Sequence, residues 1–115
     1  MEFIGYKKCT TCIKMEKIMK EKGLDYNYRE IDKDKPSIKE LKNWHKKSGI
    51  DINKFFNTHG KIYREKNLKD KLKGMSTDEK FELLASDGMI VKRPILLNGN
   101  KVLVGNDVKK YLESL

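Results

Sequence analysis

The chain has 115 residues, of which 37% are hydrophobic and 37% charged, and its formal net charge is +9. This size and composition are those of one domain that buries a core without the help of disulfides or metals. No stretch approaches the roughly 18 apolar residues that a membrane span requires. No signal peptide precedes Phe3 either, so the sequence predicts a cytoplasmic protein without a membrane partner. In that compartment, paired cysteines are more often catalytic, redox-sensing or metal-bound than structural.

The positive charge leaves two interpretations open. Only Arg29, Arg64 and Arg93 among the 26 basic residues are arginines, and acidic residues are interspersed with the lysines. Base-edge recognition and bidentate phosphate recognition both favour arginine. We therefore favour a solvated, lysine-rich surface and expect no direct DNA binding. The alternative is a surface that binds nucleic acid or an acidic protein.

The N-terminal segment predicts a strand, a helix and a second strand. Residues 2–6 form a short apolar strand, residues 10–22 an amphipathic helix, and residues 24–31 an alternating strand. Gly23 is placed to close the helix as its C′ residue. Two strands joined by one helix pair in parallel through a right-handed crossover.

Residues 36–88 predict a helical insertion. Pro36, preceded by Asp34 or Lys35, opens a first helix that Gly49 ends. The rest is expected to hold a short helix at 51–56, a loop at 57–60, helical turns at 61–73, and a helix from the capping box at 76–79 to about residue 86.

The C-terminal segment predicts a hairpin followed by a helix. Residues 92–105 contain two short apolar runs around Asn98-Gly99, a strong signal for a two-residue turn. Asn106 or Asp107 is placed to cap the last helix. The order βαβ, helices, ββα predicts a thioredoxin-like α/β fold with a mixed sheet. We expect a single domain over residues 1–115, with the insertion at about 36–88 between its two halves.

Cys9 and Cys12 are the two cysteines, and Thr10 and Thr11 separate them where the first strand gives way to the first helix. A Cys-x-x-Cys in this position is typical of a thiol–disulfide redox site. Free backbone N–H groups and the helix dipole would stabilise a thiolate at Cys9. Cys12, one turn on, is close enough to resolve a mixed disulfide. The pair could instead be two inert buried thiols.

A zinc site would need two further ligands, and His45 and His59 are the only histidines. Their spacing matches none of the usual histidine pairs of zinc sites. We therefore expect neither a metal nor a bound cofactor.

Arg93-Pro94 precedes the first hairpin strand. A proline there is tolerated as the first residue of an edge strand. We favour a cis-proline loop opposite Cys9, with the guanidinium aimed at the thiolate. Arg93 would then lower the pKa of Cys9 and hold an oxyanion or a glutathione carboxylate. The loop at residues 57–60 is either a plain turn or a second source of polar groups at the site.

Four motifs carry a resemblance to a known family. They are Cys9-x-x-Cys12, Phe55–Glu65, Leu83–Met89 and Lys92–Ile95. In this order, and over essentially the whole chain, they resemble the ArsC/Spx family, and most of all its YusI-type, arsenate reductase-like branch. The resemblance implies a thioredoxin-like fold with a helical insertion.

The resemblance to the arsenate reductases implies that Cys9 attacks the oxyanion and that Arg93 binds it, with glutathione and glutaredoxin releasing the product. The chain has Cys12 where those enzymes have serine or threonine, and it lacks arginines near Asn57 and Val104.

Our main hypothesis is a cytosolic thiol–disulfide oxidoreductase of the ArsC type. Cys9 is the nucleophile, Cys12 resolves the mixed disulfide, and Arg93 stabilises the thiolate or a bound anion. A small thiol or oxyanion substrate would contact Thr10, Thr11, Asn57 and Pro94. Glutathione, thioredoxin or glutaredoxin would act as the reductant.

The Spx-type regulators of the same family support an alternative. The resemblance to them implies a redox-sensing transcriptional regulator in which Cys9 and Cys12 form the switch. Such a protein binds the C-terminal domain of the RNA polymerase α subunit. The chain has Ile13 and His59 where those regulators have arginines.

Overall fold

The computed structural model describes all residues, 1–115, and contains one mixed four-stranded sheet. The strands are β1 (Glu2–Gly5), β2 (Asn27–Glu30), β3 (Ile95–Asn98) and β4 (Lys101–Val104), in the order β2-β1-β3-β4. β1 pairs in parallel with β2 and antiparallel with β3, and β3 pairs antiparallel with β4. The predicted α/β, thioredoxin-like fold is confirmed.

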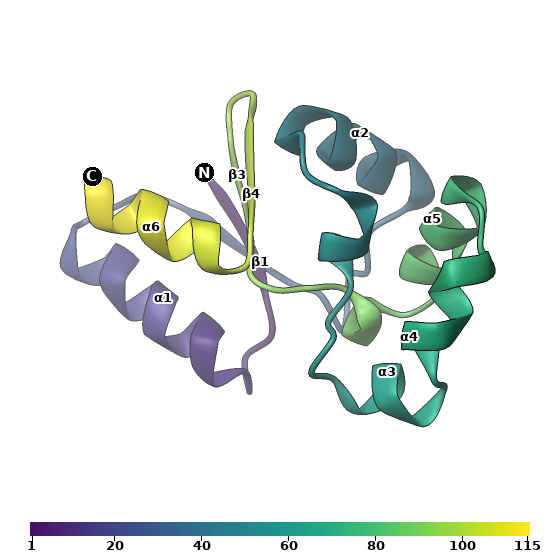
Figure 1. Cartoon of the computed structure of the whole chain (residues 1–115). Helices are drawn as coiled ribbons and strands as arrows, with labels where there is room; N and C mark the ends of the chain where they lie inside the picture. Colours follow the sequence, from purple (N-terminus) through teal and green to yellow (C-terminus); the bar gives the residue numbers. More distant parts are fainter.

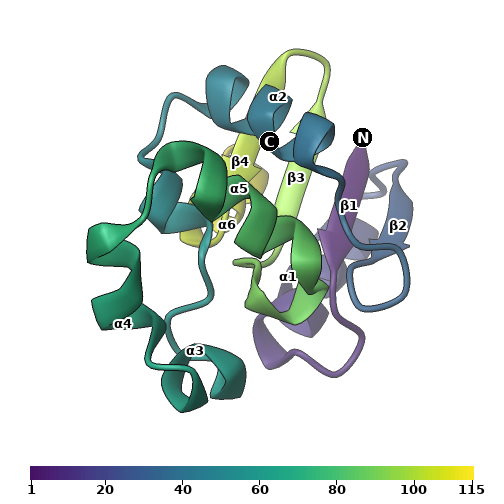
Figure 2. The same ribbon diagram turned by 90° about the vertical axis from the view of Figure 1, so that its right-hand side faces the viewer.

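The helices cover the two faces of the sheet in separate layers (Figure 1). On one face lie α1 (Thr10–Glu21) and α6 (Asn106–Ser114), side by side. The insertion covers the other face with α2 (Ile38–Ser48), η1 (Ile52–Phe55), α3 (Lys61–Glu65), α4 (Leu68–Lys71), η2 (Leu72–Gly74), α5 (Thr77–Ser86) and η3 (Gly88–Ile90). Figure 2 shows this insertion in front of the sheet.

Alternation along the strands builds a separate core on each face. In β1, Phe3 contributes to the cluster beneath α1 and α6, whereas Ile4 contributes to the larger cluster beneath the insertion. In β3, Leu96 and Ile95 divide in the same way. Successive side chains of a strand point to opposite faces, so a period of two supplies both cores at once.

The helix α1 ends as the sequence predicts, and β2 is shorter than predicted. Gly23 has φ +66°, its N–H donates to the carbonyl of Lys20, and the N–H of Leu24 donates to that of Met19. This is the Schellman arrangement that a C′ glycine permits. Because Leu24 belongs to this turn, the strand begins only at Asn27 and not at residue 24.

The start of α2 differs from the prediction. Ser37 is its N-cap and forms a reciprocal capping box with Glu40, so the helix begins at Ile38 and is not opened by Pro36. Pro36 lies before the cap and is buried. The side-chain hydroxyl of Ser37 accepts a hydrogen bond from the N–H of Glu40. A proline has no side-chain acceptor with which to make this bond.

The C-terminal unit contains the predicted hairpin with the turn displaced by one residue. Asn98 pairs with Lys101, so Gly99 and Asn100 are the central residues of the turn. Gly99 has φ +59°, as the first central position of a type II′ turn requires. The last helix begins after Gly105, so the predicted cap at Asn106 or Asp107 is wrong. None of the helices combines the length and the apolar character that crossing a membrane requires.

Candidate functional site: a thiol pair beside a cis-proline loop

Cys9 and Cys12 occupy the first turn of α1 in contrasting surroundings. Cys9 is the N-cap residue, with φ −85° and ψ 120°, and its side chain is partly exposed. Cys12 has 0% of its surface exposed, and both thiols are free. The backbone N–H of Cys9 donates to the carbonyl of Tyr6 at 3.0 Å, which fixes the bend between β1 and the helix.

Several groups favour the ionised form of Cys9. Partial burial opposes ionisation, but it is outweighed by hydrogen bonds from the backbone and the thiol of Cys12 and from the backbone of Thr11. The positive charge of Arg93 acts in the same direction, and together these groups lower the pKa of Cys9 below its usual value. A thiolate is the reactive form of cysteine, so the structure singles out Cys9 as the more nucleophilic thiol.

The environment of Cys12 has the opposite effect. Burial is the main cause that raises the pKa of Cys12 to about 12, and the negative charge of a Cys9 thiolate raises it further. The backbone of Tyr6 and the charge of Arg93 offset part of this effect. In the reduced protein Cys12 therefore stays protonated at neutral pH, whereas Cys9 ionises more readily than an ordinary cysteine.

Arg93 connects the thiol pair to the cis-proline loop. The Arg93–Pro94 peptide bond is cis, as the sequence predicts. The guanidinium lies 5.2 Å from the ring centroid of Tyr6 and donates to the carbonyls of Met89 and Val91 at 3.2 and 3.3 Å. Its Nε is buried and has no hydrogen-bond partner. A buried donor on a cation is costly to leave unpaired, so this N–H is suited to donate a hydrogen bond to an anion or a water molecule.

The insertion fixes the segment that leads into this loop. Phe56 and Val91 form an antiparallel bridge. On either side of it, the N–H of Asn57 donates to the carbonyl of Ile90, and the N–H of Lys92 donates to that of Phe55, both at 2.7 Å. The segment before Arg93 is thus paired with the segment after η1, although the two lie far apart in the sequence.

The other predicted site residues are placed less directly. Thr11 acts on Cys9 through its backbone, and Thr10 is exposed at the start of α1. The carbonyl of Pro94 accepts from the N–H of Gly105 at 2.8 Å, which joins the loop to the start of α6. The structure thus brings together Cys9, Cys12, Thr11 and Arg93. It shows no contact of Thr10 or Asn57 with the thiols, so their role in substrate binding stays a prediction.

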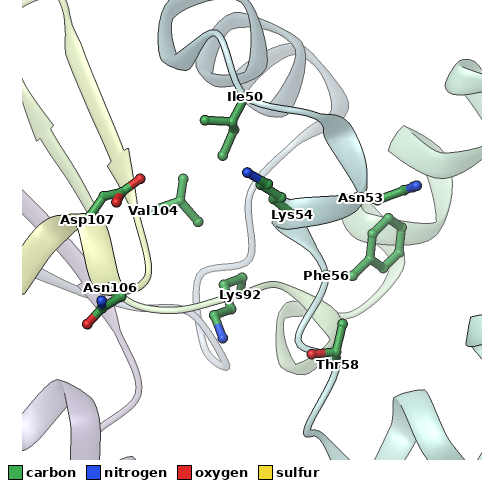
Figure 3. Close-up of a pocket in the computed structure, with 9 residues that line it drawn as sticks. All are labelled: Ile50, Asn53, Lys54, Phe56, Thr58, Lys92, Val104, Asn106 and Asp107. Atoms are coloured by element: carbon green, nitrogen blue, oxygen red, sulfur yellow. The ribbon is translucent and has the colours of Figure 1, made fainter.

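A cleft of about 370 Å³ lies between the start of α6 and the insertion (Figure 3). Its lining residues are Ile50, Asn53, Lys54, Phe56, Thr58, Lys92, Val104, Asn106 and Asp107. None of the predicted site residues lines it, but Lys92 is the direct neighbour of Arg93, and Thr58 follows Asn57. Lys92 belongs to the Lys92–Ile95 motif, whereas Lys54 has no local signal in the sequence because exposed lysines occur throughout the chain.

A tyrosine beside the thiols was also missed. Lys7 Nζ lies 3.7 Å from the ring centroid of Tyr28, and the ring of Phe3 lies 5.2 Å from it. The hydroxyl of Tyr28 points to the space next to Gly5 and Cys12. This position follows from the register of β1 against β2, which pairs Phe3 with Tyr28 and which no local sequence pattern reveals.

The two histidines do not join the thiols. His45 packs edge-on against the rings of Phe55 and Phe81, with centroids 6.1 and 5.6 Å away. No group of three or more His, Cys, Asp or Glu side chains is arranged to hold a metal ion.

Comparison with known proteins identifies the family. The family model of the ArsC family matches residues 4–114. The chain belongs to the ArsC family. It is 52% identical to the uncharacterized protein YusI of Bacillus subtilis, over 99% of this chain and 97% of YusI. It is 28% identical to the regulatory protein MgsR of the same organism, over 98% of this chain and 88% of MgsR. It is 34% identical to an arsenate reductase of Haemophilus influenzae, over 69% of this chain and 67% of that enzyme.

Solved structures of similar proteins show the same architecture. An ArsC family related protein from Bacteroides fragilis superposes with a TM-score of 0.92 at 39% identity, over 97% of this chain and 94% of that one. The Staphylococcus aureus protein SACOL0876 superposes with a TM-score of 0.84 at 47% identity, over 97% of this chain and 95% of that one. ArsC relatives of this chain thus include an arsenate reductase and a regulator, so family membership leaves the choice between catalysis and regulation to the site itself.

Proposed function

We propose that this ArsC protein is a thiol–disulfide oxidoreductase in which Cys9 is the nucleophile and Cys12 the resolving thiol. The observation that carries the proposal is the contrast between the two thiols. The pKa of the partly exposed Cys9 is lowered, whereas that of the fully buried Cys12 is raised to about 12. Such a pair defines an order of reaction, because only the ionised and accessible sulfur can attack first.

In the first step, the Cys9 thiolate attacks one sulfur of a substrate disulfide. A bond forms between Cys9 and that sulfur, and the other half of the substrate leaves as a thiolate that takes up a proton. In the second step, Cys12 loses its proton and attacks Cys9, which releases the remaining half of the substrate and leaves a Cys9–Cys12 disulfide. A small thiol such as glutathione, or a thioredoxin-type protein, then reduces this disulfide and completes the cycle.

Variants of the two cysteines test this order. Cys9→Ser is expected to abolish disulfide reductase turnover, whereas Cys12→Ser is expected to accumulate a stable mixed disulfide at Cys9. Disulfide reductase turnover of each variant is measured with glutathione in excess. The mixed disulfide at Cys9 is measured by intact mass after acid quenching. Full activity of Cys9→Ser would disprove the proposal.

An oxyanion is the second class of substrate that the site supports. The unpaired Nε of Arg93 offers a donor to an anion near Cys9, and the chain is 34% identical to an arsenate reductase over part of its length. To test for arsenate reduction, the protein is incubated with arsenate and glutathione, and the arsenite formed is measured. Arsenite formed by the wild-type protein and lost in Cys9→Ser assigns arsenate reduction, and its absence leaves disulfides as the substrates.

A redox-sensing regulator is the second candidate function, because the similarity to the regulatory protein MgsR extends over 98% of this chain. In that case the Cys9–Cys12 pair switches between dithiol and disulfide without turnover. It would control binding to the C-terminal domain of the RNA polymerase α subunit. The test is calorimetric titration of that domain with the reduced and with the oxidised protein. If neither state binds the domain, the regulator function is rejected.

A further inference from the structure

The space above Gly5, the last residue of β1, is shared by two polar groups. A Cβ atom on Gly5 would lie 2.8 Å from the hydroxyl oxygen of Tyr28 and 3.1 Å from the sulfur of Cys12. The missing side chain of Gly5 therefore leaves room for the phenol hydroxyl and the buried thiol on the same side of the β1 backbone. Both groups belong to the core cluster on the α1 face of the sheet.

Packing holds Tyr28 in this place. Its partner across the strands is Phe3, whose ring lies 5.2 Å away, and Lys7 Nζ lies 3.7 Å from its ring centroid. The hydroxyl of Tyr28 makes no hydrogen bond to a protein group in the reduced structure, in contrast to that of Tyr26, which donates to Glu16 at 2.8 Å. The Tyr28 hydroxyl is thus a free donor beside a thiol that must ionise during the proposed reaction.

Tyr28 stays protonated while the thiols change their charge. Burial is the main cause that raises the pKa of Tyr28 above its usual value, and the negative charges of Cys12, Glu16, Cys9 and Glu30 act in the same direction. A phenol that keeps its proton can donate a hydrogen bond to a neighbouring thiolate without itself becoming an anion.

We infer that Tyr28 stabilises the thiolate of Cys12 in the resolving step by donating its O–H to the Cys12 sulfur. This inference rests on the proposed function, because it concerns the second of its two steps. Cys12 loses its proton to solvent, and its thiolate, held by the Tyr28 hydroxyl, attacks Cys9. The Cys9–Cys12 bond forms, the bond from Cys9 to the substrate breaks, and the substrate leaves as a thiolate that takes up a proton.

The resolving step needs such a donor because Cys12 is buried and ionises with difficulty. Once Cys9 is part of a mixed disulfide, its negative charge is gone and no longer opposes ionisation of Cys12. Burial still does. A hydrogen bond to a charged acceptor shifts an ionisation equilibrium by about tenfold to a hundredfold, and Tyr28 is placed to supply it.

Ellman's reagent separates the two steps in one experiment, because each half of this aromatic disulfide is coloured when it is released. Attack by Cys9 releases the first half, and attack by Cys12 on the mixed disulfide releases the second. A stopped-flow trace of the reduced wild-type protein is therefore expected to show two phases of equal amplitude. The rate of the second phase, followed against pH, reports the ionisation of Cys12.

Tyr28→Phe removes only the hydroxyl and keeps the ring against Phe3. The second phase is expected to slow by about tenfold or more at neutral pH, and its pH dependence to move to higher pH. The first phase is expected to stay within about twofold of wild type. Tyr26→Phe is the matched control, since it removes a hydroxyl that serves Glu16, and both of its phases are expected to match wild type.

The charged groups around the two sulfurs are the same in all three proteins. Arg93 faces both thiols, while Lys7, Glu16 and Glu30 face Tyr28. A change in the second phase alone is therefore attributable to the missing donor. A purely structural role of Tyr28 would instead alter both phases or the melting temperature, which is measured for each variant.

The outcomes distinguish this inference from the function on which it rests. A second phase in Tyr28→Phe with wild-type rate and pH dependence overturns the role of Tyr28 and leaves the two-step mechanism intact. A wild-type trace without a second phase overturns the two-step mechanism itself. A slower second phase, an unchanged first phase and an unchanged melting temperature support the inference.

Discussion

Arg93 is expected to set the reactivity of Cys9 through its charge. An opposite charge within about 4–6 Å changes the pKa of a group by about 1 to 3. Arg93 is the smallest of the four causes that lower the pKa of Cys9, so its loss is expected to raise that pKa only in part. Replacement of Arg93 by methionine should therefore reduce the thiolate fraction of Cys9 about tenfold at a pH below its pKa.

Alkylation by iodoacetamide measures this effect. The rate at Cys9 is followed by peptide mass between about pH 5 and 9, a range in which Cys12, with a pKa of about 12, stays protonated. We expect Arg93→Met to lower the rate at neutral pH about tenfold and to move its midpoint to higher pH. Arg93→Lys, which keeps the charge but loses the planar donors, should retain most of the wild-type rate.

A second arginine supplies the matched control. Arg64 lies on α3, is exposed and forms no ion pair, so Arg64→Met changes the net charge by the same amount, and Arg64 is not among the groups that shift the pKa of Cys9 or Cys12. Its alkylation profile should match wild type. If Arg93→Met and Arg64→Met have the same profile, the charge of Arg93 does not act on Cys9 and the electrostatic reasoning is wrong.

Two further predictions concern stability. Arg29 binds Glu40 at 2.6 Å, and its hydrogen bond is the main cause that lowers the pKa of Glu40 from 4.5 to about 2. The resulting stability is present above pH 4.5 and lost as the pH falls toward 2. Because 39% of the Glu40 side chain is exposed, we expect Glu40→Gln to cost only about 1–2 kcal/mol at pH 7. Urea unfolding at pH 7 and pH 3 should show this difference shrinking in acid, and a constant difference would contradict it. A Cβ on Gly88 would overlap the carbonyl oxygen of Ile31, so Gly88→Ala should destabilise the fold by about 3 kcal/mol, and a variant as stable as wild type in urea would contradict this packing.

The sequence predicts the sheet and the thiol helix well because their signals are local. Gly23 supplies the left-handed residue that a Schellman turn needs, and Asn98-Gly99 marks the hairpin. The errors lie where two local signals compete. Pro36 suggested a helix start, but Ser37 and Glu40 can cap reciprocally, and a capping box satisfies two backbone groups that a proline leaves unpaired.

Part of the site depends on contacts that no local pattern reveals. Cys9 and Cys12 lie three positions apart in the first turn of one helix, and Arg93-Pro94 is a dipeptide, so both can be found by inspection. The approach of Tyr28 to Cys12 depends on the register of two strands and on the absence of a side chain at Gly5. Such a contact is decided by pairing across the sheet, and a single sequence contains no direct signal for it.

The choice between an enzyme and a regulator turns on how the Cys9–Cys12 disulfide is made and removed. An enzyme must form it rapidly and have it reduced rapidly, whereas a switch must keep it long enough to alter a partner. The buried Cys12 slows both events, because it must ionise to attack and leaves poorly as a thiolate when the disulfide is reduced. A hydroxyl that stabilises the Cys12 thiolate speeds both the formation and the reduction of the disulfide. If Tyr28 acts as inferred, the site is therefore built for turnover, which favours the oxidoreductase over the regulator.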